Sequence, residues 1–124
     1  MEIMTTHKIL QKSTMFKDKR MLLISRSTFA GSGAYAQHWL GDNHRTWQDM
    51  KLSIAGIMNF NMFGIPLIGA DTCGFFPEDG MTKAESDEIC GRWYQLSTFY
   101  PFAHINRNIE GGEPTEPYNL DGKW

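Results

Sequence analysis

The stretch Gln37–Asn43, QHWLGDN, decides the fold, because it ends a short apolar segment with a carboxylate at a turn. The stretch Ile65–Phe75, IPLIGADTCGF, repeats that arrangement with a second carboxylate. A helical pattern separates the two stretches, so they predict strands of a parallel sheet joined by a helix. Catalytic groups in such sheets lie at the carboxyl ends of the strands. We therefore expect Asp42 and Asp71 to lie at one end of neighbouring strands.

The rest of the chain continues the alternation of strands and helices. Apolar residues recur at intervals of three and four after Thr46, which can cap a helix that Gly64 and Pro66 end. Either Thr82 or Ser86 can cap the next helix. The expected helices are 5–16, 47–61 and 84–99, and the expected strands are 21–25, 35–40, 66–69 and a short last strand after 100–103.

The composition argues against several classes of function. The chain has 124 residues, enough for one modest domain, and a formal net charge of −2. Its 12 Lys and Arg are scattered among 14 Asp and Glu, so no basic patch points to nucleic acid as a partner. No apolar run approaches the roughly 20 residues that a membrane span needs. Residues 1–20 are polar and lysine-bearing and lack the apolar core of a signal peptide.

Three motifs in a fixed order make the chain resemble glycoside hydrolase family 31, the α-glucosidase family. They are ISRSTFAG at 24–31, HWLGD at 38–42 and GADTCGF at 69–75, and the resemblance is strongest over 20–119. It implies an α/β fold that is a partial (β/α)8 TIM barrel, roughly the last four strands with the intervening helices. A complete barrel takes about 250 residues. Residues 1–124 are therefore expected to be a fragment of one catalytic domain, with the remainder of the barrel missing.

The resemblance assigns a role to each residue that matches a family motif. Asp42 matches the general acid/base, which protonates the glycosidic oxygen and then deprotonates water. Arg26 matches an arginine that binds sugar hydroxyls, and Asp71 an acid that shapes the glycone pocket. Trp39 and Phe75 match the aromatic wall of that pocket. Taken singly, each acid also suits a turn or a helix cap, and each aromatic residue suits the core.

The second carboxylate of a retaining enzyme is not found in this chain. Retaining glycosidases need a nucleophile about 5–5.5 Å from the acid/base. In the family this residue lies in a Trp-x-Asp-Met-Asn-Glu stretch, which the sequence does not contain. The pair Asp49–Met50 matches it only superficially, because it lies inside a helical repeat. We therefore expect the isolated chain to carry the acid/base without the nucleophile, and to be inactive.

The last predicted strand departs from the family. After Phe-Tyr-Pro-Phe the family has Arg-Asn-His-Asn, whereas this chain has HINR at 104–107. Asn106 occupies the ungapped place of the family's sugar-binding histidine, and His104 can replace that histidine only after a local shift. His44 stands where many relatives have a tryptophan, and the loop 76–83 is longer than usual. These differences put the glycone pocket in question.

Cys73 and Cys90 are the only cysteines. The resemblance implies that they form a disulfide, as in the secreted and lysosomal members of the family, and hence a secretory-pathway, lysosomal or extracellular location. In a cytosolic protein they would be thiols instead. Two cysteines without matched spacing do not indicate a zinc site, and we expect neither a metal nor a cofactor.

Together these residues predict a fragment of a retaining α-glucosidase-like hydrolase that cleaves α-linked glucosides in an oligosaccharide or glycoside. One alternative is a degenerate homologue that binds carbohydrate but no longer cleaves it, which the altered last strand favours. The other alternative is a truncated gene product with no function of its own.

Overall fold

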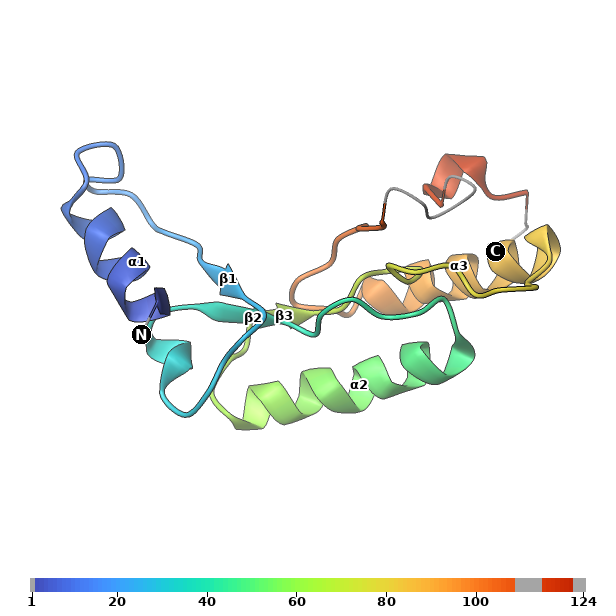
Figure 1. The fold of residues 1–124 in the computed structure, drawn as a ribbon, viewed down its shortest axis with the longest axis horizontal. Helices are drawn as coiled ribbons and strands as arrows, with labels where there is room; N and C mark the ends of the chain where they lie inside the picture. The colour runs from blue at the N-terminus through green and yellow to red at the C-terminus, as the bar shows by residue number, and fades with distance from the viewer. Residues whose placement is uncertain (1, 109–114, 122–124) are drawn as a thin grey trace.

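The computed structural model describes residues 2–108 and 115–121, which form a small parallel sheet with helices around it (Figure 1). Strands β1 (Ile24–Ser25), β2 (Gln37–Trp39) and β3 (Ile68–Gly69) lie in the order β1-β2-β3. Both pairs are parallel, with Ile24 opposite Gln37 and His38 opposite Ile68. The predicted α/β class and the parallel pairing are confirmed.

The helices are α1 (Glu2–Lys12), α2 (Trp47–Met62) and α3 (Lys83–Ser97), with single 3-10 turns at Ser32–Ala34 and Pro117–Asn119. The predicted caps of the two long helices are confirmed. Thr46 Oγ1 accepts the Asp49 N–H at 3.0 Å, and Thr82 forms a capping box with Glu85. Their starts lie within one residue of the prediction, because a side-chain cap fixes where a helix begins.

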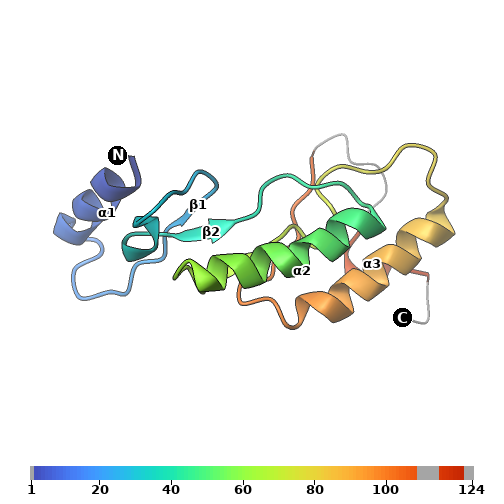
Figure 2. The same ribbon diagram turned by 90° about the horizontal axis from the view of Figure 1, so that it is seen from below.

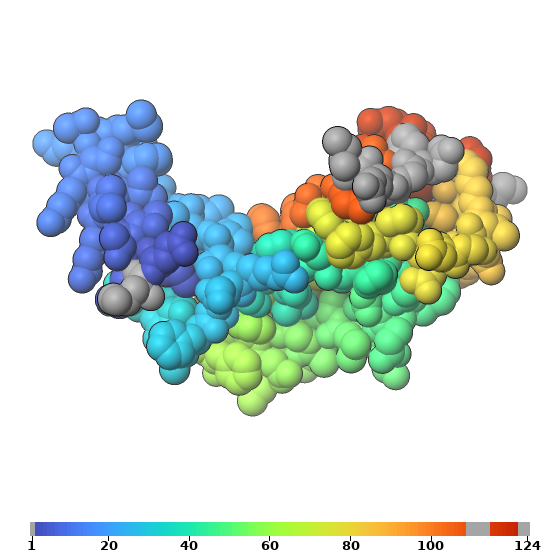
Figure 3. Space-filling model, in the orientation of Figure 1, coloured from blue at the N-terminus to red at the C-terminus, as the bar shows by residue number. Residues whose placement is uncertain are grey.

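Helix α1 was predicted at 5–16 but ends at Lys12. The Ser13 hydroxyl there accepts the Met15 N–H at 3.3 Å, and such local hydrogen bonds compete with continuation of a helix. The apolar side of α1 is only partly packed, since Ile9 is 61% exposed whereas Leu10 is half-buried. In Figure 3 the blue segment 2–20 forms an arm at one end of the molecule.

The strands are shorter than predicted, and no strand follows 100–103 in the described part of the chain. In place of that strand, a single bridge joins Asp71 to His104. The pairing is limited to hydrogen bonds such as Phe102 N–H to the Ile68 carbonyl at 3.1 Å. Pro101 has no N–H to donate, which works against a longer ladder.

The core lies where β3 meets α2 and α3, which run beside each other in Figure 2. The Trp93 indole is fully buried and donates to the Tyr100 hydroxyl at 3.0 Å, so its N–H is satisfied. This core fixes the carboxyl ends of the strands, where the predicted site residues lie. Its buried members are Ile57, Ile68, Ala70, Cys73, Ile89, Cys90, Trp93 and Tyr100.

Candidate functional site

The first pair of predicted site residues meets beyond the ends of β1 and β2. Arg26 follows β1 directly, and Asp42 lies three residues after β2. Arg26 Nη1 donates to Asp42 Oδ2 at 3.3 Å, with 59% and 26% of the two side chains exposed. Gly41 between the strand and the acid has φ 91°, and a Cβ there would lie 2.8 Å from Arg26 Nε. The positive φ favours glycine at this position, and the absence of a Cβ leaves room for the Arg26 side chain.

The second carboxylate, Asp71, is completely buried two residues after β3. The Trp39 indole N–H donates to Asp71 Oδ1 at 2.7 Å, and His104 Nε2 lies 2.6 Å from the same oxygen. Asn106 Nδ2 donates to the other oxygen, Oδ2, at 3.4 Å. Both carboxylate oxygens thus have partners within the protein. Asp71 can shape a pocket by fixing the Trp39 and His104 rings, while its own oxygens face inward.

A ring contact joins these two groups. The Arg26 guanidinium carbon lies 5.4 Å from the centre of the Trp39 ring, within cation–π range. The contacts therefore run without a break from Asp42 through Arg26 and Trp39 to Asp71 and His104. The expectation that Arg26, Asp42 and Asp71 lie together at one end of the sheet agrees with this arrangement.

Phe75 lies apart from this run of side-chain contacts in the described structure. Its ring meets Phe76 edge-on at 4.7 Å, and Phe76 in turn lies 5.2 Å from His44. His44 Nδ1 is 3.9 Å from a Glu78 carboxylate oxygen, and both side chains are about half exposed. A cluster of aromatic and acidic side chains thus lies beside the loop that carries Asp42. It comprises His44 and residues 75–78.

Cys73 and Cys90 form a disulfide, with Cα atoms 4.6 Å apart and both residues fully buried. The bond joins the segment after Asp71 to α3. Arg45 reinforces the same connection, since its Nε donates to the Cys73 carbonyl at 3.0 Å and its Nη1 to Ser86 Oγ at 2.8 Å. Burial lowers the pKa of Arg45, and the positive charge of Arg107 lowers it further. The negative charge of Asp87 acts in the opposite direction.

His38 was missed as a site neighbour by sequence reasoning. It is buried on β2, its ring stacks on Phe60 at 3.9 Å, and its Nδ1 lies 3.0 Å from the Ser25 carbonyl oxygen. Burial lowers the pKa of His38, and its bond to Ser25 acts against that shift. The ring ties β2 to the residue before Arg26. Side chains alternate between the two faces of a strand, so the sequence could have placed His38 on the face of the sheet opposite to that of Trp39.

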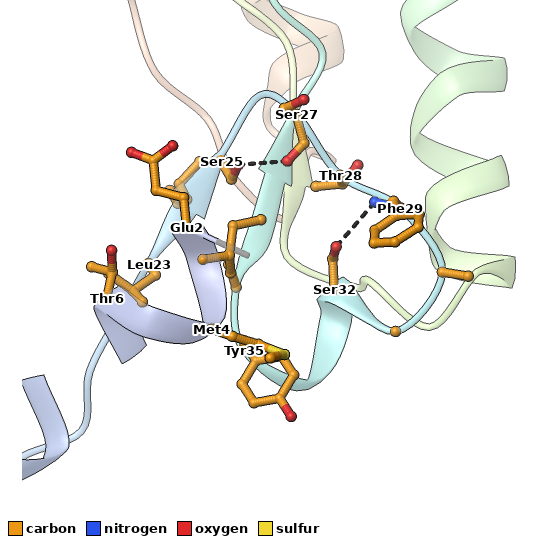
Figure 4. Close-up of a pocket in the computed structure, with 15 residues that line it drawn as sticks. Glu2, Met4, Thr6, Leu23, Ser25, Ser27, Thr28, Phe29, Ser32 and Tyr35 are labelled. Carbon is orange, nitrogen blue, oxygen red and sulfur yellow. Dashed lines mark hydrogen bonds between the residues drawn. The ribbon is translucent and has the colours of Figure 1, made fainter. Parts of the chain in front are cut away.

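A cavity lies elsewhere, between α1, β1 and the segment 27–36 (Figure 4). It has a volume of about 700 Å³ and a mixed lining that includes Glu2, Ser25, Phe29 and Tyr35. None of the predicted site residues lines it. Within residues 2–108 and 115–121, no group of three or more His, Cys, Asp or Glu is placed to hold a metal ion. Among the same residues, no helix is long and apolar enough to span a membrane.

Comparison with known proteins gives a consistent family. The family model for the glycosyl hydrolases family 31 TIM-barrel domain matches residues 1–123. Intestinal sucrase-isomaltase of Oryctolagus cuniculus is 50% identical over 103 residues, which are 83% of this chain and 5% of that protein. Lysosomal alpha-glucosidase of Bos taurus is 44% identical over 119 residues, which are 96% of this chain and 12% of that protein.

A solved structure adds the three-dimensional likeness. The crystal structure of a Glc1Man2-bound glucosidase II alpha subunit superposes with a TM-score of 0.78 at 31% identity. The match covers 98% of this chain and 12% of that chain. The chain therefore spans only a small part of the length of these relatives.

Proposed function

The chain belongs to glycoside hydrolase family 31, and on that premise we propose that it is a piece of the catalytic barrel of a retaining α-glucosidase-like enzyme. The piece corresponds to roughly the last four strands of the barrel. The observation that carries the proposal is the unbroken set of contacts from Asp42 through Arg26 and Trp39 to Asp71 and His104. All five residues lie near the carboxyl ends of the strands or at the bridge beside them. That is the position in which barrel enzymes carry their chemistry.

Asp42 is the proposed acid/base. It is partly exposed, so a glycosidic oxygen can approach its carboxyl group. In the first step Asp42 gives its proton to the leaving oxygen while a second carboxylate attacks the anomeric carbon and forms a glycosyl ester. In the second step Asp42 takes a proton from water, which attacks the anomeric carbon and releases the second carboxylate. That second carboxylate comes from a part of the protein outside residues 1–124.

Arg26 and Trp39 are the proposed sugar contacts. More than half of the Arg26 side chain is exposed, and only its Nη1 is engaged by Asp42 in the contacts seen here. A guanidinium has five N–H donors in a fixed plane, which suits adjacent sugar hydroxyls. The Trp39 indole N–H is bound to Asp71, which fixes the orientation of the ring face. Phe75 is the proposed outer part of the aromatic wall.

His104, in the segment that departs from the family sequence, is the proposed supporting residue of the glycone pocket. Asp71 holds Nε2 of the ring, the Phe102 ring stacks on it at 4.6 Å, and 23% of the side chain is exposed. We assign the exposed part of the His104 ring to the glycone side of the site, where it offers ring carbon, because Nδ1 is buried and Nε2 is held by Asp71. Asn106, at the family's histidine place, contacts Asp71 instead.

The proposed substrates are oligosaccharides or glycosides with α-linked glucose. The names of the relatives support a carbohydrate substrate, and they also include alpha-xylosidase 1 of Arabidopsis thaliana, 44% identical over 107 residues. The proposed location is the secretory pathway, a lysosome or the cell exterior. The buried disulfide supports that location, because disulfides persist in oxidising compartments.

The test separates the piece from the whole enzyme. Purified residues 1–124 should not hydrolyse an aryl α-glucoside, whereas the complete protein, with an upstream Trp-x-Asp-Met-Asn-Glu stretch, should. Turnover by the isolated chain that Asp42→Asn abolishes would show that the proposal of a missing nucleophile is wrong.

A non-catalytic carbohydrate-binding protein is the second candidate. The replacement of the family's last-strand residues by His104 and Asn106 favours it. A complete protein that binds an α-glucoside in calorimetry but shows no turnover would support this candidate over the enzyme.

A further inference from the structure

Asn43, the residue after Asp42, joins two loops that the sequence keeps far apart. Its Nδ2 donates to the Asp71 carbonyl at 3.0 Å, and its Oδ1 accepts the Phe75 N–H at 3.0 Å. Its main-chain carbonyl also accepts the N–H groups of Phe75 and Phe76, both at 2.9 Å. One residue thus bonds to both ends of the segment 71–76.

The segment that Asn43 holds has an unfavourable backbone. Cys73 and Gly74 have φ angles of 74° and 84°, in the left-handed region. A non-glycine residue in that region costs free energy and persists only where its surroundings impose it. The disulfide and Arg45 act on the Cys73 side of the segment. Asn43 acts at its two ends, next to Asp71 and at Phe75.

We propose that Asn43 is a positioning residue for the acid/base loop. Its side-chain amide keeps Asp42 in register with the segment Asp71–Phe75. The Arg26–Asp42 pair and the Trp39–Asp71 pair therefore hold fixed places relative to each other. This inference rests on the proposed function for its catalytic meaning, but the geometry it asserts can be measured without any turnover.

The test uses the oxidised full chain labelled with 15N. In the Asn43→Ala variant, the Phe75 amide loses its side-chain acceptor but keeps the main-chain carbonyl of residue 43. It should exchange about five- to tenfold faster relative to the Ile89 and Trp93 amides of α3. The indole N–H resonance of Trp39 and the Nε–H resonance of Arg26 should also move. The α3 amides serve as the measure of an intact fold.

Asn61→Ala is the matched control. Asn61 Nδ2 donates to the Ile57 carbonyl within α2 at 2.9 Å, so this variant loses one side-chain to main-chain hydrogen bond, whereas Asn43→Ala loses two. It should leave the site resonances and the Phe75 exchange unchanged. Equal changes in both variants would overturn the proposal, because they would reflect a general loss of stability.

If the alanine variant does not fold, the Asn43→Asp variant tests the positioning role. The aspartate keeps an acceptor for the Phe75 N–H but loses the donor to the Asp71 carbonyl. We expect Phe75 protection to be retained while the Trp39 indole resonance moves. Unmoved Trp39 and Arg26 resonances in a folded variant would overturn the positioning role, even if the complete protein proved to be an active enzyme. Inactivity of the complete protein would instead count against the proposed function alone.

Discussion

Reduction of the Cys73–Cys90 disulfide should destabilise the chain measurably. The two cysteines are 17 residues apart in the sequence. Closing a loop of that length removes conformational entropy from the unfolded chain, which amounts to about 3 kcal/mol at 25 °C in the chain-entropy estimate. With a urea m-value of about 1–3 kcal/mol per M, the unfolding midpoint should fall by about 1–3 M.

The assay is urea unfolding of the oxidised and the reduced chain, followed by tryptophan fluorescence. The double variant Cys73→Ala/Cys90→Ala is the control, because a reductant should not change its midpoint. A difference below about 1 kcal/mol between the oxidised and reduced wild-type chains would refute the reasoning. It would mean that the unfolded chain is already restrained over this loop, or that the thiols do not pair.

Three further predictions concern local structure and pH. Gly74→Ala should cost about 2 kcal/mol or more in unfolding free energy, because φ is 84° and a Cβ would lie 2.5 Å from the Arg45 main-chain nitrogen. Gly80→Ala is the control: φ is 78° but nothing lies within 4 Å of a Cβ, so this variant should cost only about 1 kcal/mol. Equal losses in the two variants would contradict this prediction. Thr82→Ala should cost about 1 kcal/mol through loss of the capping box at α3, measured by urea unfolding, and a neutral result would show that the cap adds nothing. Burial raises the pKa of Tyr94 to about 12. As the pH rises, the Tyr94 hydroxyl therefore loses its proton at a lower pH in the unfolded chain than in the folded chain. Stability from Tyr94 should therefore be complete below pH 10 and fall toward pH 12, and Tyr94→Phe should make the alkaline decline less steep.

The positions of α2 and α3 could be predicted from the sequence because their signals are local. The apolar stripe after Thr46 and the capping side chain of Thr82 each fix a helix start without knowledge of the remainder of the fold. The alternation of these helices with apolar strands also indicated the parallel sheet. The motif residues Arg26 and Asp42 lie at strand ends for the same reason.

The parts that could not be predicted depend on contacts between distant segments. The lengths of the strands depend on how many partners each finds, and periodicity does not report that. The attachment of His104 and Asn106 to Asp71 follows from how the chain returns after α3. The four bonds of Asn43 likewise depend on the approach of two loops about thirty positions apart, and an amide after a strand gives only a weak hint of them.

The most direct test of the account is the effect of Asp42→Asn in the complete enzyme on two α-glucosides with different leaving groups. If Asp42 is the acid/base, kcat/KM for a poor leaving group such as the second glucose of maltose should fall by about 10²–10⁴. The formation of the glycosyl ester from a dinitrophenyl α-glucoside, whose leaving group needs no proton, should be much less affected. Glu88→Gln, which changes a carboxylate on α3 that pairs with Arg92, serves as the control. Equal losses for both substrates, or no loss for maltose, would contradict the assignment of Asp42.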